Sequence, residues 1–227
     1  MKTKQVCQVI TTTPKLKVKT NSVPVLVRKN VSNVFAEKVQ EELNIIPEHI
    51  KYELAYYNYK IVVCRMLVEE YPELKGEKPR GWSSGTWSSA SGIYFQEERE
   101  IIVAEKFINY YTRGLNNQKK PGCILRHEMG HAVDKVFGKL FTPLSETRAF
   151  KLAYNKDKEY IESLQLSKQK QLSYYLQDGN SGKEEAFAET FANLLGGGAD
   201  VISNDCFSKY FSNVREFVND KVLAANL

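Results

Sequence analysis

The sequence is poor in the residue types that most protein metal sites use. Its 227 residues include only three histidines and four cysteines. The cysteines are scattered and form no CxxC pair, which argues against a cysteine zinc site. The chain has no run of about 18 apolar residues, so no membrane-spanning helix is expected. The N-terminus also lacks the apolar stretch of a secretory signal, which leaves the cytoplasm open as a compartment.

Acidic residues are missing from the first 36 positions, which contain seven lysines and arginines. The rest of the chain holds 25 basic and 27 acidic residues, so the net charge of +5 arises in this segment. We therefore predict a basic, loosely structured arm at residues 1–31 and one domain at residues 32–227. The arm either meets an acidic partner or a membrane surface, or is a solvated, partly extended leader. Few aromatic residues lie among its lysines, so no nucleic-acid partner is expected.

Hydrophobic residues make up 42% and charged residues 26% of the chain, which is ordinary for a globular domain. The hydrophobic pattern predicts several helices and one small mixed sheet, hence an α+β fold that we expect to be a monomer. Strands are expected at residues 60–67 and in a hairpin at 93–95 and 100–104. A loop rich in glycine and serine precedes the hairpin and contains two tryptophans. Helices are expected at residues 32–45, 47–57, 123–137, 145–164, 184–195 and 207–224.

One short motif, HExxH at residues 127–131, has the pattern of a zinc site. On a helix, residues four apart share a face, so His127 and His131 can bind one Zn²⁺. Glu128 then lies beside the metal, where it can take a proton from bound water. Gly130 puts no side chain between the two ligands, so we expect another element to approach closely there.

A zinc peptidase needs a third protein ligand and an open coordination position. No third histidine is nearby, so a carboxylate has to serve. Glu185 and Glu189 lie four residues apart in an apolar segment, where unpaired acids are costly. One of them can bind zinc while the other orients a ligating histidine. An acidic helix N-terminus is the alternative, but it explains Glu189 poorly because this residue lies in the second turn.

The two motifs together resemble a known family. HEMGHAVD at residues 127–134, followed by EEAFAETFA at residues 184–192, is similar to the catalytic domain of anthrax lethal factor. Its relatives include the secreted Pro-Pro endopeptidases. The stretch KPRGW…GTW…SGIYF…EIIVAE is also similar, and the resemblance covers roughly residues 35–225. It implies a zincin-like metallopeptidase domain, a peptide or protein substrate and secretion, with the cytoplasm as the alternative compartment.

The resemblance also implies roles for individual residues. It assigns Glu185 as the third zinc ligand and Glu189 as the residue that orients a histidine. The family has a tyrosine upstream of this helix that supports the oxyanion of the transition state. At the family's spacing this chain has Asp178, so the candidates are Tyr174 and Tyr175, and we favour Tyr175 as the catalytic partner of Glu128.

The first strand of the hairpin resembles the edge strand on which such enzymes bind an extended peptide. Gly92, Ile93 and Tyr94 are therefore expected to contact the substrate. The leading hypothesis is a gluzincin, a zinc endopeptidase with two histidines, one glutamate and one catalytic Zn²⁺. The alternative is a catalytically inert interaction module on the same scaffold, although a structural zinc site has no need of Glu128.

Overall fold

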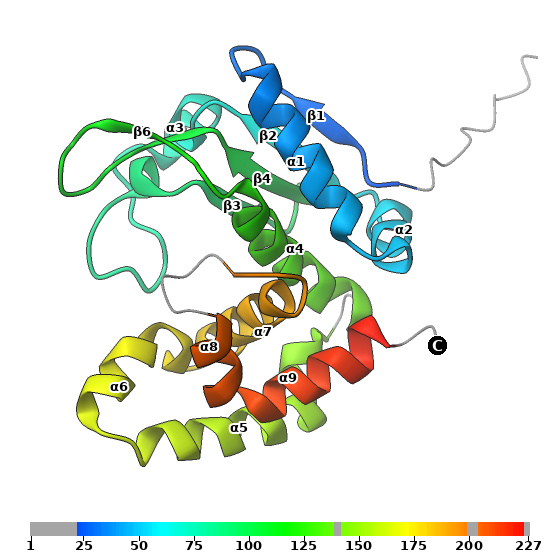
Figure 1. The fold of residues 1–227 in the computed structure, drawn as a ribbon, viewed down its shortest axis with the longest axis vertical. Coiled ribbons are helices and arrows are strands. Elements are labelled where there is room, and N and C mark those ends of the chain that lie inside the picture. The colour runs from blue at the N-terminus through cyan, green and yellow to red at the C-terminus, as the bar shows by residue number, and fades with distance from the viewer. Residues whose placement is uncertain (1–21, 139–141, 199–203, 225–227) are drawn as a thin grey trace, which may run out of the picture.

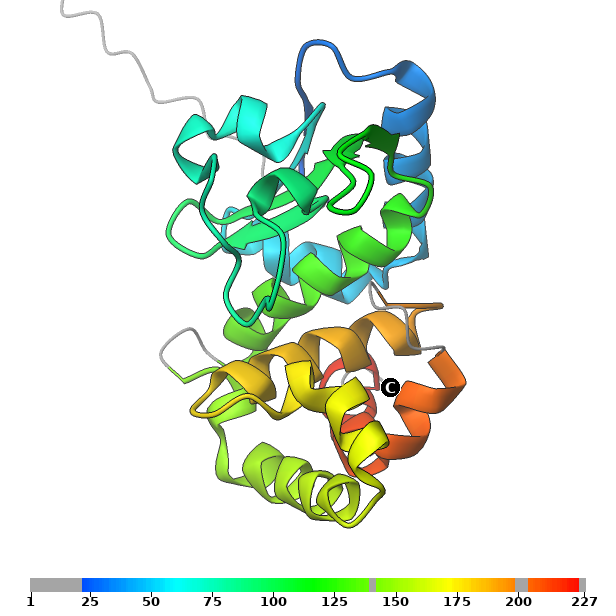
Figure 2. The same ribbon diagram turned by 90° about the vertical axis from the view of Figure 1, so that its left-hand side faces the viewer.

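The computed structural model describes residues 22–138, 142–198 and 204–224. Two halves are visible in this part of the chain: an N-terminal half with the sheet and a C-terminal half made of helices (Figure 1). The halves meet where helix α4 (Pro121–Phe137) lies against helix α7 (Ser181–Leu194), as the turned view in Figure 2 also shows. The predicted α+β class, mostly helical with a small mixed sheet, is confirmed.

A four-stranded sheet forms the centre of the N-terminal half. Its strands lie in the order β1 (Val25–Val27), β2 (Lys60–Cys64), β4 (Glu100–Ala104) and β3 (Gly92–Phe95). The pairs β1–β2 and β2–β4 are parallel, and β3 pairs with β4 antiparallel, so the sheet is mixed. The predicted hairpin is confirmed, and its first strand lies at the edge of the sheet. The strand predicted at residues 60–67 is too long, because Leu67 already begins a helix.

The sheet buries both of its faces, and side chains alternate between two apolar clusters as strand geometry requires. The face toward α4 belongs to the main core and presents Ile61, Val63, Ile101 and Val103. The opposite face presents Val62, Cys64, Ile102 and Ala104. Trp82 and Trp87 of the glycine- and serine-rich loop pack against this second cluster. The loop is thereby fixed beside the edge strand.

The helices predicted at residues 32–45 and 47–57 are confirmed as α1 (Asn33–Ile45) and α2 (Glu48–Tyr56). The Ser32 hydroxyl accepts a hydrogen bond from the Phe35 amide and so caps α1. Three further elements of this half were not predicted from the sequence. They are α3 (Leu67–Glu70) and a second, two-stranded sheet made of β5 (Lys106–Ile108) and β6 (Leu115–Asn117).

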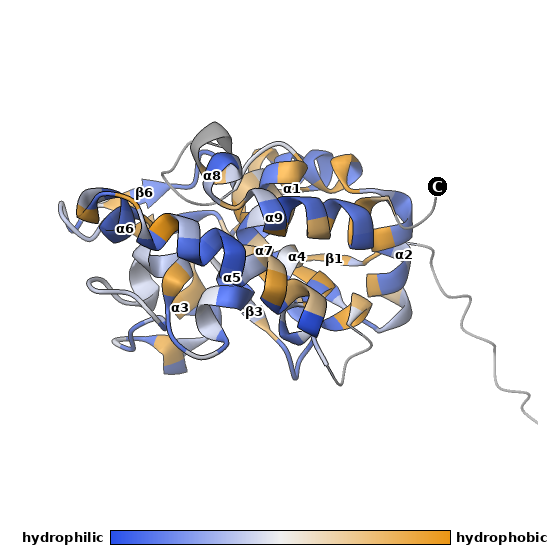
Figure 3. Ribbon diagram, turned by 90° about the horizontal axis from the view of Figure 1, so that it is seen from below, coloured by the Kyte–Doolittle hydropathy of each residue, from blue (hydrophilic) through white to orange (hydrophobic). Residues whose placement is uncertain are grey.

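The C-terminal half packs helices around α7. It contains α5 (Arg148–Glu162), α6 (Leu166–Leu172), α8 (Asn204–Tyr210) and α9 (Ser212–Val218), followed by one π-helical turn over Asn219–Leu223. Helix α5 turns mainly hydrophilic residues outward (Figure 3). The single helix predicted at residues 207–224 is wrong, because the chain breaks at Phe211. The Asp157 carboxylate on α5 accepts the backbone N–H groups of Asn213 and Val214 and so starts α9 afresh.

Part of the predicted N-terminal arm belongs to the sheet. Val23 is buried in the main core, and Val25–Val27 form β1 beside β2. Residues 1–21, which carry most of the arm's lysines, lie outside the described residues. Within the described ranges, no helix has both the length and the apolar character needed to cross a bilayer.

Candidate metal centre

Helices α4 and α7 approach each other unusually closely at Gly130. A β-carbon at this position would lie 2.6 Å from the Cα atom of Ala188 and 2.9 Å from its carbonyl oxygen. Real β-carbons do not tolerate such contacts with backbone, so only glycine lets the two helices meet here. This contact brings the HExxH motif on α4 against the acidic face of α7, as the glycine in the motif predicts.

Three side chains from these helices form a group that can hold a metal ion. The ligand atoms of His127, His131 and Glu185 all lie within 4.8 Å of one another. Glu185 Oε2 is 3.3 Å from His127 Nε2 and 3.6 Å from His131 Nε2. Ligand atoms at about 2.0–2.2 Å from a tetrahedral zinc ion lie about 3.3–3.6 Å apart. The spacing therefore fits one zinc ion with these three protein ligands.

The carboxylate of Glu189 orients the first histidine. His127 Nδ1 lies 2.9 Å from Glu189 Oε2, and Glu189 is 1% exposed. Because an ionised carboxylate only accepts hydrogen bonds, the Nδ1–H group donates, and Nε2 is the nitrogen that faces Glu185 and can bind a metal once its proton is lost. This arrangement fixes the tautomer that a metal-binding imidazole requires.

The electrostatics of the group favour a bound cation. Burial lowers the pKa of His127, but the Glu185 and Glu189 carboxylates outweigh it and raise that pKa well above its usual value. Burial raises the pKa of Glu185, but the two imidazoles hold it well below its usual range. Glu185 Oε2 is buried without a hydrogen-bond partner among the described residues. A divalent cation would satisfy this oxygen and replace the protons that the carboxylates attract.

The edge strand β3 passes directly beside Glu128. A β-carbon on Gly92 would lie 2.7 Å from Glu128 Oε1 and 2.3 Å from the Ile124 side chain. Glycine therefore allows the β3 backbone to reach the carboxylate. Burial raises the pKa of Glu128, while the nearby imidazoles oppose this effect. A carboxylate with a raised pKa is suited to accept and release a proton near neutral pH.

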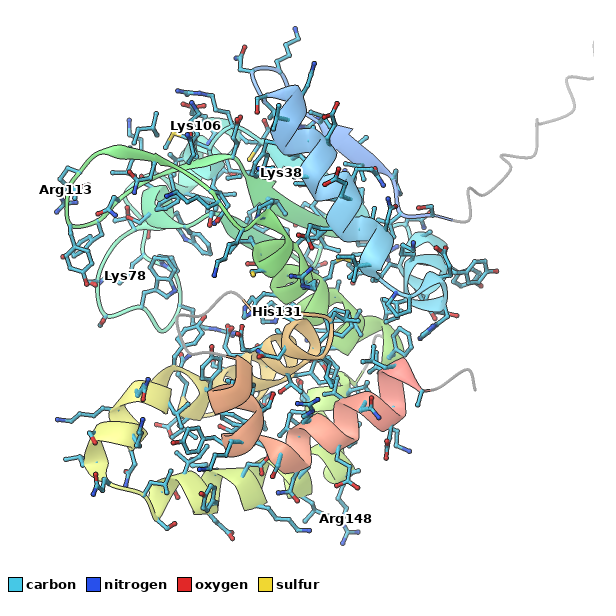
Figure 4. All side chains as sticks on the ribbon, in the orientation of Figure 1. Lys38, Lys78, Lys106, Arg113, His131 and Arg148 are labelled. Carbon is cyan, nitrogen blue, oxygen red and sulfur yellow. The ribbon has the colours of Figure 1, made fainter. Side chains whose placement is uncertain are left out.

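A cleft of about 890 Å³ runs between the two halves and contains the metal-binding group. Its walls include Gly92, Ile93 and Tyr94 of the edge strand. The Tyr94 ring stacks on His131 with 6.0 Å between centroids, and Ile93 packs into the second apolar cluster. Figure 4 shows His131 at the level where the halves meet. The structure thus brings the predicted strand and the predicted ligands into one cavity.

Comparisons with known proteins agree with this geometry. The family model described as anthrax toxin lethal factor, N- and C-terminal domain, matches residues 10–195. The chain belongs to the anthrax toxin lethal factor family. The solved structure of the Pro-Pro endopeptidase PPEP-2 from Paenibacillus alvei is similar in fold, with a TM-score of 0.55 and 22% sequence identity. The similarity covers 86% of this chain and 96% of that one. No curated protein matches the chain significantly.

Membership of the lethal factor family is consistent with a zinc site at His127, His131 and Glu185, since this is a family of zinc metallopeptidases. The match begins inside the segment predicted as an arm. The zincin-like fold expected from the motifs is confirmed by the similarity to PPEP-2.

The two candidate tyrosines of this lethal factor family member both line the cleft but differ in their neighbours. Tyr174 lines the cleft with Glu185, and burial together with the nearby charges of Glu185 and Glu128 raises the pKa of Tyr174. The Tyr175 ring packs into the core against Phe207 and Phe211 and is 1% exposed. The sequence favoured Tyr175, but these surroundings make Tyr174 the candidate that the proposal below uses. Both residues lie in the 3₁₀ turn Ser173–Leu176, and their rings meet edge to face with 5.4 Å between centroids.

Arg80 is a cleft residue that the sequence analysis did not single out. Its guanidinium lies 2.8 Å from Glu184 Oε2 and 3.6 Å from Glu185 Oε1, which ties the tryptophan-containing loop to α7. The residue lies within the KPRGW stretch that resembles the family. That stretch marks the segment, but it cannot show which of its side chains crosses the cleft.

Proposed function

We propose that this protein is a zinc-dependent endopeptidase of the gluzincin type, with one catalytic Zn²⁺ and a peptide or protein substrate. The observation that carries the proposal is the spacing of His127 Nε2, His131 Nε2 and Glu185 Oε2, which suits tetrahedral zinc, beside a half-buried Glu128. Membership of the lethal factor family supports the same proposed function. The open side of the group faces a cleft large enough for several peptide residues.

The substrate would bind in extended form along β3. An edge strand offers backbone N–H and C=O groups that can pair with a peptide, while the cleft walls contact its side chains. Gly92 lets this strand run beside Glu128, so a peptide paired with β3 would place its scissile bond near the carboxylate. Gly92, Ile93 and Tyr94 are the residues that we assign to substrate binding.

In the proposed reaction, a water molecule attacks the carbonyl carbon of the scissile bond. When bound, zinc supplies Lewis acidity, which lowers the pKa of water and polarises the carbonyl. Glu128 accepts the proton that the attacking water loses as the new C–O bond forms. The same carboxylic acid then donates this proton to the leaving nitrogen as the C–N bond breaks.

We assign Tyr174 to the oxyanion. Its hydroxyl already lies beside Glu185, and a neutral phenol with a raised pKa remains a hydrogen-bond donor at physiological pH. A short movement of the hydroxyl from Glu185 to the substrate oxygen would stabilise the charge that develops there.

An inert interaction module on the same scaffold is the alternative. Glu128 favours catalysis over this alternative, because a half-buried carboxylate whose pKa is raised by desolvation is costly and a structural zinc site has no use for it.

Metal removal tests the proposal. The purified protein should contain about one zinc ion per chain and cleave members of a random peptide library. A chelator should abolish cleavage and added zinc should restore it, while His131→Ala should lose the metal. Cleavage that persists in the fully metal-free protein would contradict the proposal.

A further inference from the structure

Three consecutive glycines at residues 196–198 follow α7. Different structural constraints explain why glycine occupies these positions. Gly196 and Gly197 have positive φ values of 108° and 137°, and the Gly197 amide donates to the Ala192 carbonyl. These two residues end the helix in the way that left-handed glycines commonly do. Gly198 is not among the residues with positive φ. Stopping the helix therefore does not explain why position 198 is glycine.

The space around Gly198 supplies the reason. A β-carbon there would lie 1.7 Å from Glu189 Oε1 and 2.3 Å from its Cδ atom. Any side chain at this position would occupy the place of the carboxylate. The backbone at Gly198 thus covers one side of the group whose other oxygen accepts the hydrogen bond from His127 Nδ1.

Two side chains hold this arrangement in place. Asn193 Nδ2 donates to Glu189 Oε1 at 3.2 Å and to the Glu189 carbonyl oxygen at 2.8 Å. Arg126, which is 4% exposed and immediately precedes His127, donates from Nε to the Gly197 carbonyl at 3.2 Å. Its guanidinium also pairs with Glu42 on α1. The turn is therefore anchored to the metal-binding helix itself.

We propose that Gly198 and Asn193 are positioning residues that hold the Glu189 carboxylate against His127, and thereby set the affinity of the site for zinc. This inference rests on the proposed zinc site. Neither residue touches the ligand atoms, so both act through Glu189. Residues that orient a ligating histidine in this way typically change metal affinity about 10–100-fold when they are altered.

Gly198→Ala tests the proposal through zinc affinity, measured by competition with a chromogenic chelator and without any peptide. The variant should bind zinc about 10–100-fold more weakly than the wild type. Its metal-free form should also unfold at a lower urea concentration, because the displaced carboxylate is buried and hydrogen-bonded, so zinc affinity is compared under conditions in which both proteins are folded. Gly114→Ala is the matched control, since a β-carbon there would meet only Thr112 Oγ1, at 3.4 Å.

A double-mutant cycle shows whether Gly198 acts through Glu189. In a Glu189→Ala background the carboxylate is gone, so Gly198→Ala should change zinc affinity by less than about twofold. Equal losses in both backgrounds, or unchanged affinity in Gly198→Ala, would overturn the proposal.

Asn193→Ala adds no bulk, so it decides the question if Gly198→Ala fails to fold. It should weaken zinc binding only where Glu189 is present, and an equal loss in both backgrounds would overturn the proposal. A wild-type protein that binds no zinc would end both this inference and the proposed function. Wild-type zinc binding that these substitutions leave unchanged would end this inference alone.

Discussion

Gly130→Ala should damage the metal site even though alanine is the better helix former. The gain in helix propensity is about 1 kcal/mol. The new methyl group would lie 2.6 Å from the Ala188 Cα atom, whereas carbon atoms pack at about 3.5–4.0 Å, so α4 and α7 must separate by about 1 Å. Overpacking of this kind costs about 1–3 kcal/mol. The metal-free variant should therefore lose up to about 2 kcal/mol of unfolding free energy.

The zinc-loaded form should lose more than the metal-free form. Zinc sites tolerate ligand distances within about 0.2 Å, and a separation of about 1 Å moves Glu185 away from both histidines. Zinc at about 1,000 times its dissociation constant stabilises the folded state by about 4 kcal/mol, and this contribution shrinks as affinity falls. Urea unfolding with and without zinc measures both effects. Ala188→Gly should not rescue the variant, since the nearest atoms are backbone. Wild-type zinc affinity together with equal or higher stability would refute this reasoning.

Two further predictions follow from single side chains. Tyr174→Phe should lower kcat on the order of 10²-fold with zinc retained, whereas Tyr175→Phe should change it by less than about threefold; equal losses would contradict the assignment. Burial raises the pKa of Asp134 from 3.8 to about 6, so the folded protein binds a proton before the unfolded chain does as pH falls. Its contribution to stability should therefore grow by about 3 kcal/mol between about pH 7 and pH 3, and Asp134→Asn should remove this component in urea unfolding of the metal-free protein. If Asp134→Asn leaves the pH dependence of the unfolding free energy unchanged, this prediction is contradicted.

Much of the fold follows from local sequence patterns. Alternation and helical periodicity correctly located α1, α2, α4 and the β3–β4 hairpin. The hairpin turn contains no glycine or asparagine, and Arg99 adopts the left-handed conformation with a φ of 54° instead. Its guanidinium donates to the Tyr57 carbonyl at 2.9 Å, which helps to hold this conformation. Here a long-range hydrogen bond compensates for a turn sequence that lacks glycine and asparagine.

The errors arose where distant residues decide a local conformation. One apolar face continues through α8 and α9, so periodicity alone predicts a single helix. The cap that restarts the chain is Asp157, which lies 56 residues before Asn213. Residues close in sequence to Phe211 therefore cannot predict this break between α8 and α9.

In the site, too, local sequence patterns predicted some residues, and contacts between distant residues decided others. Helical spacing was enough to propose His127, Glu128 and His131, and the apolar surroundings of Glu185 suggested a buried role for it. Tyr174 and Tyr175 are adjacent, and spacing cannot tell which ring faces the cleft. Tertiary packing decides this, because the Tyr175 ring packs against Phe207 in the core, whereas Tyr174 lies near Glu185.

Glu128→Gln tests the central claim most directly, because it keeps the size of the side chain and removes its ability to accept a proton. Zinc content and peptide cleavage should be measured on the same sample. The proposed function predicts about one zinc ion per chain and a loss of cleavage of about 10²–10⁴-fold, the usual contribution of a general base. Cleavage at the wild-type rate with zinc bound would contradict the proposed function.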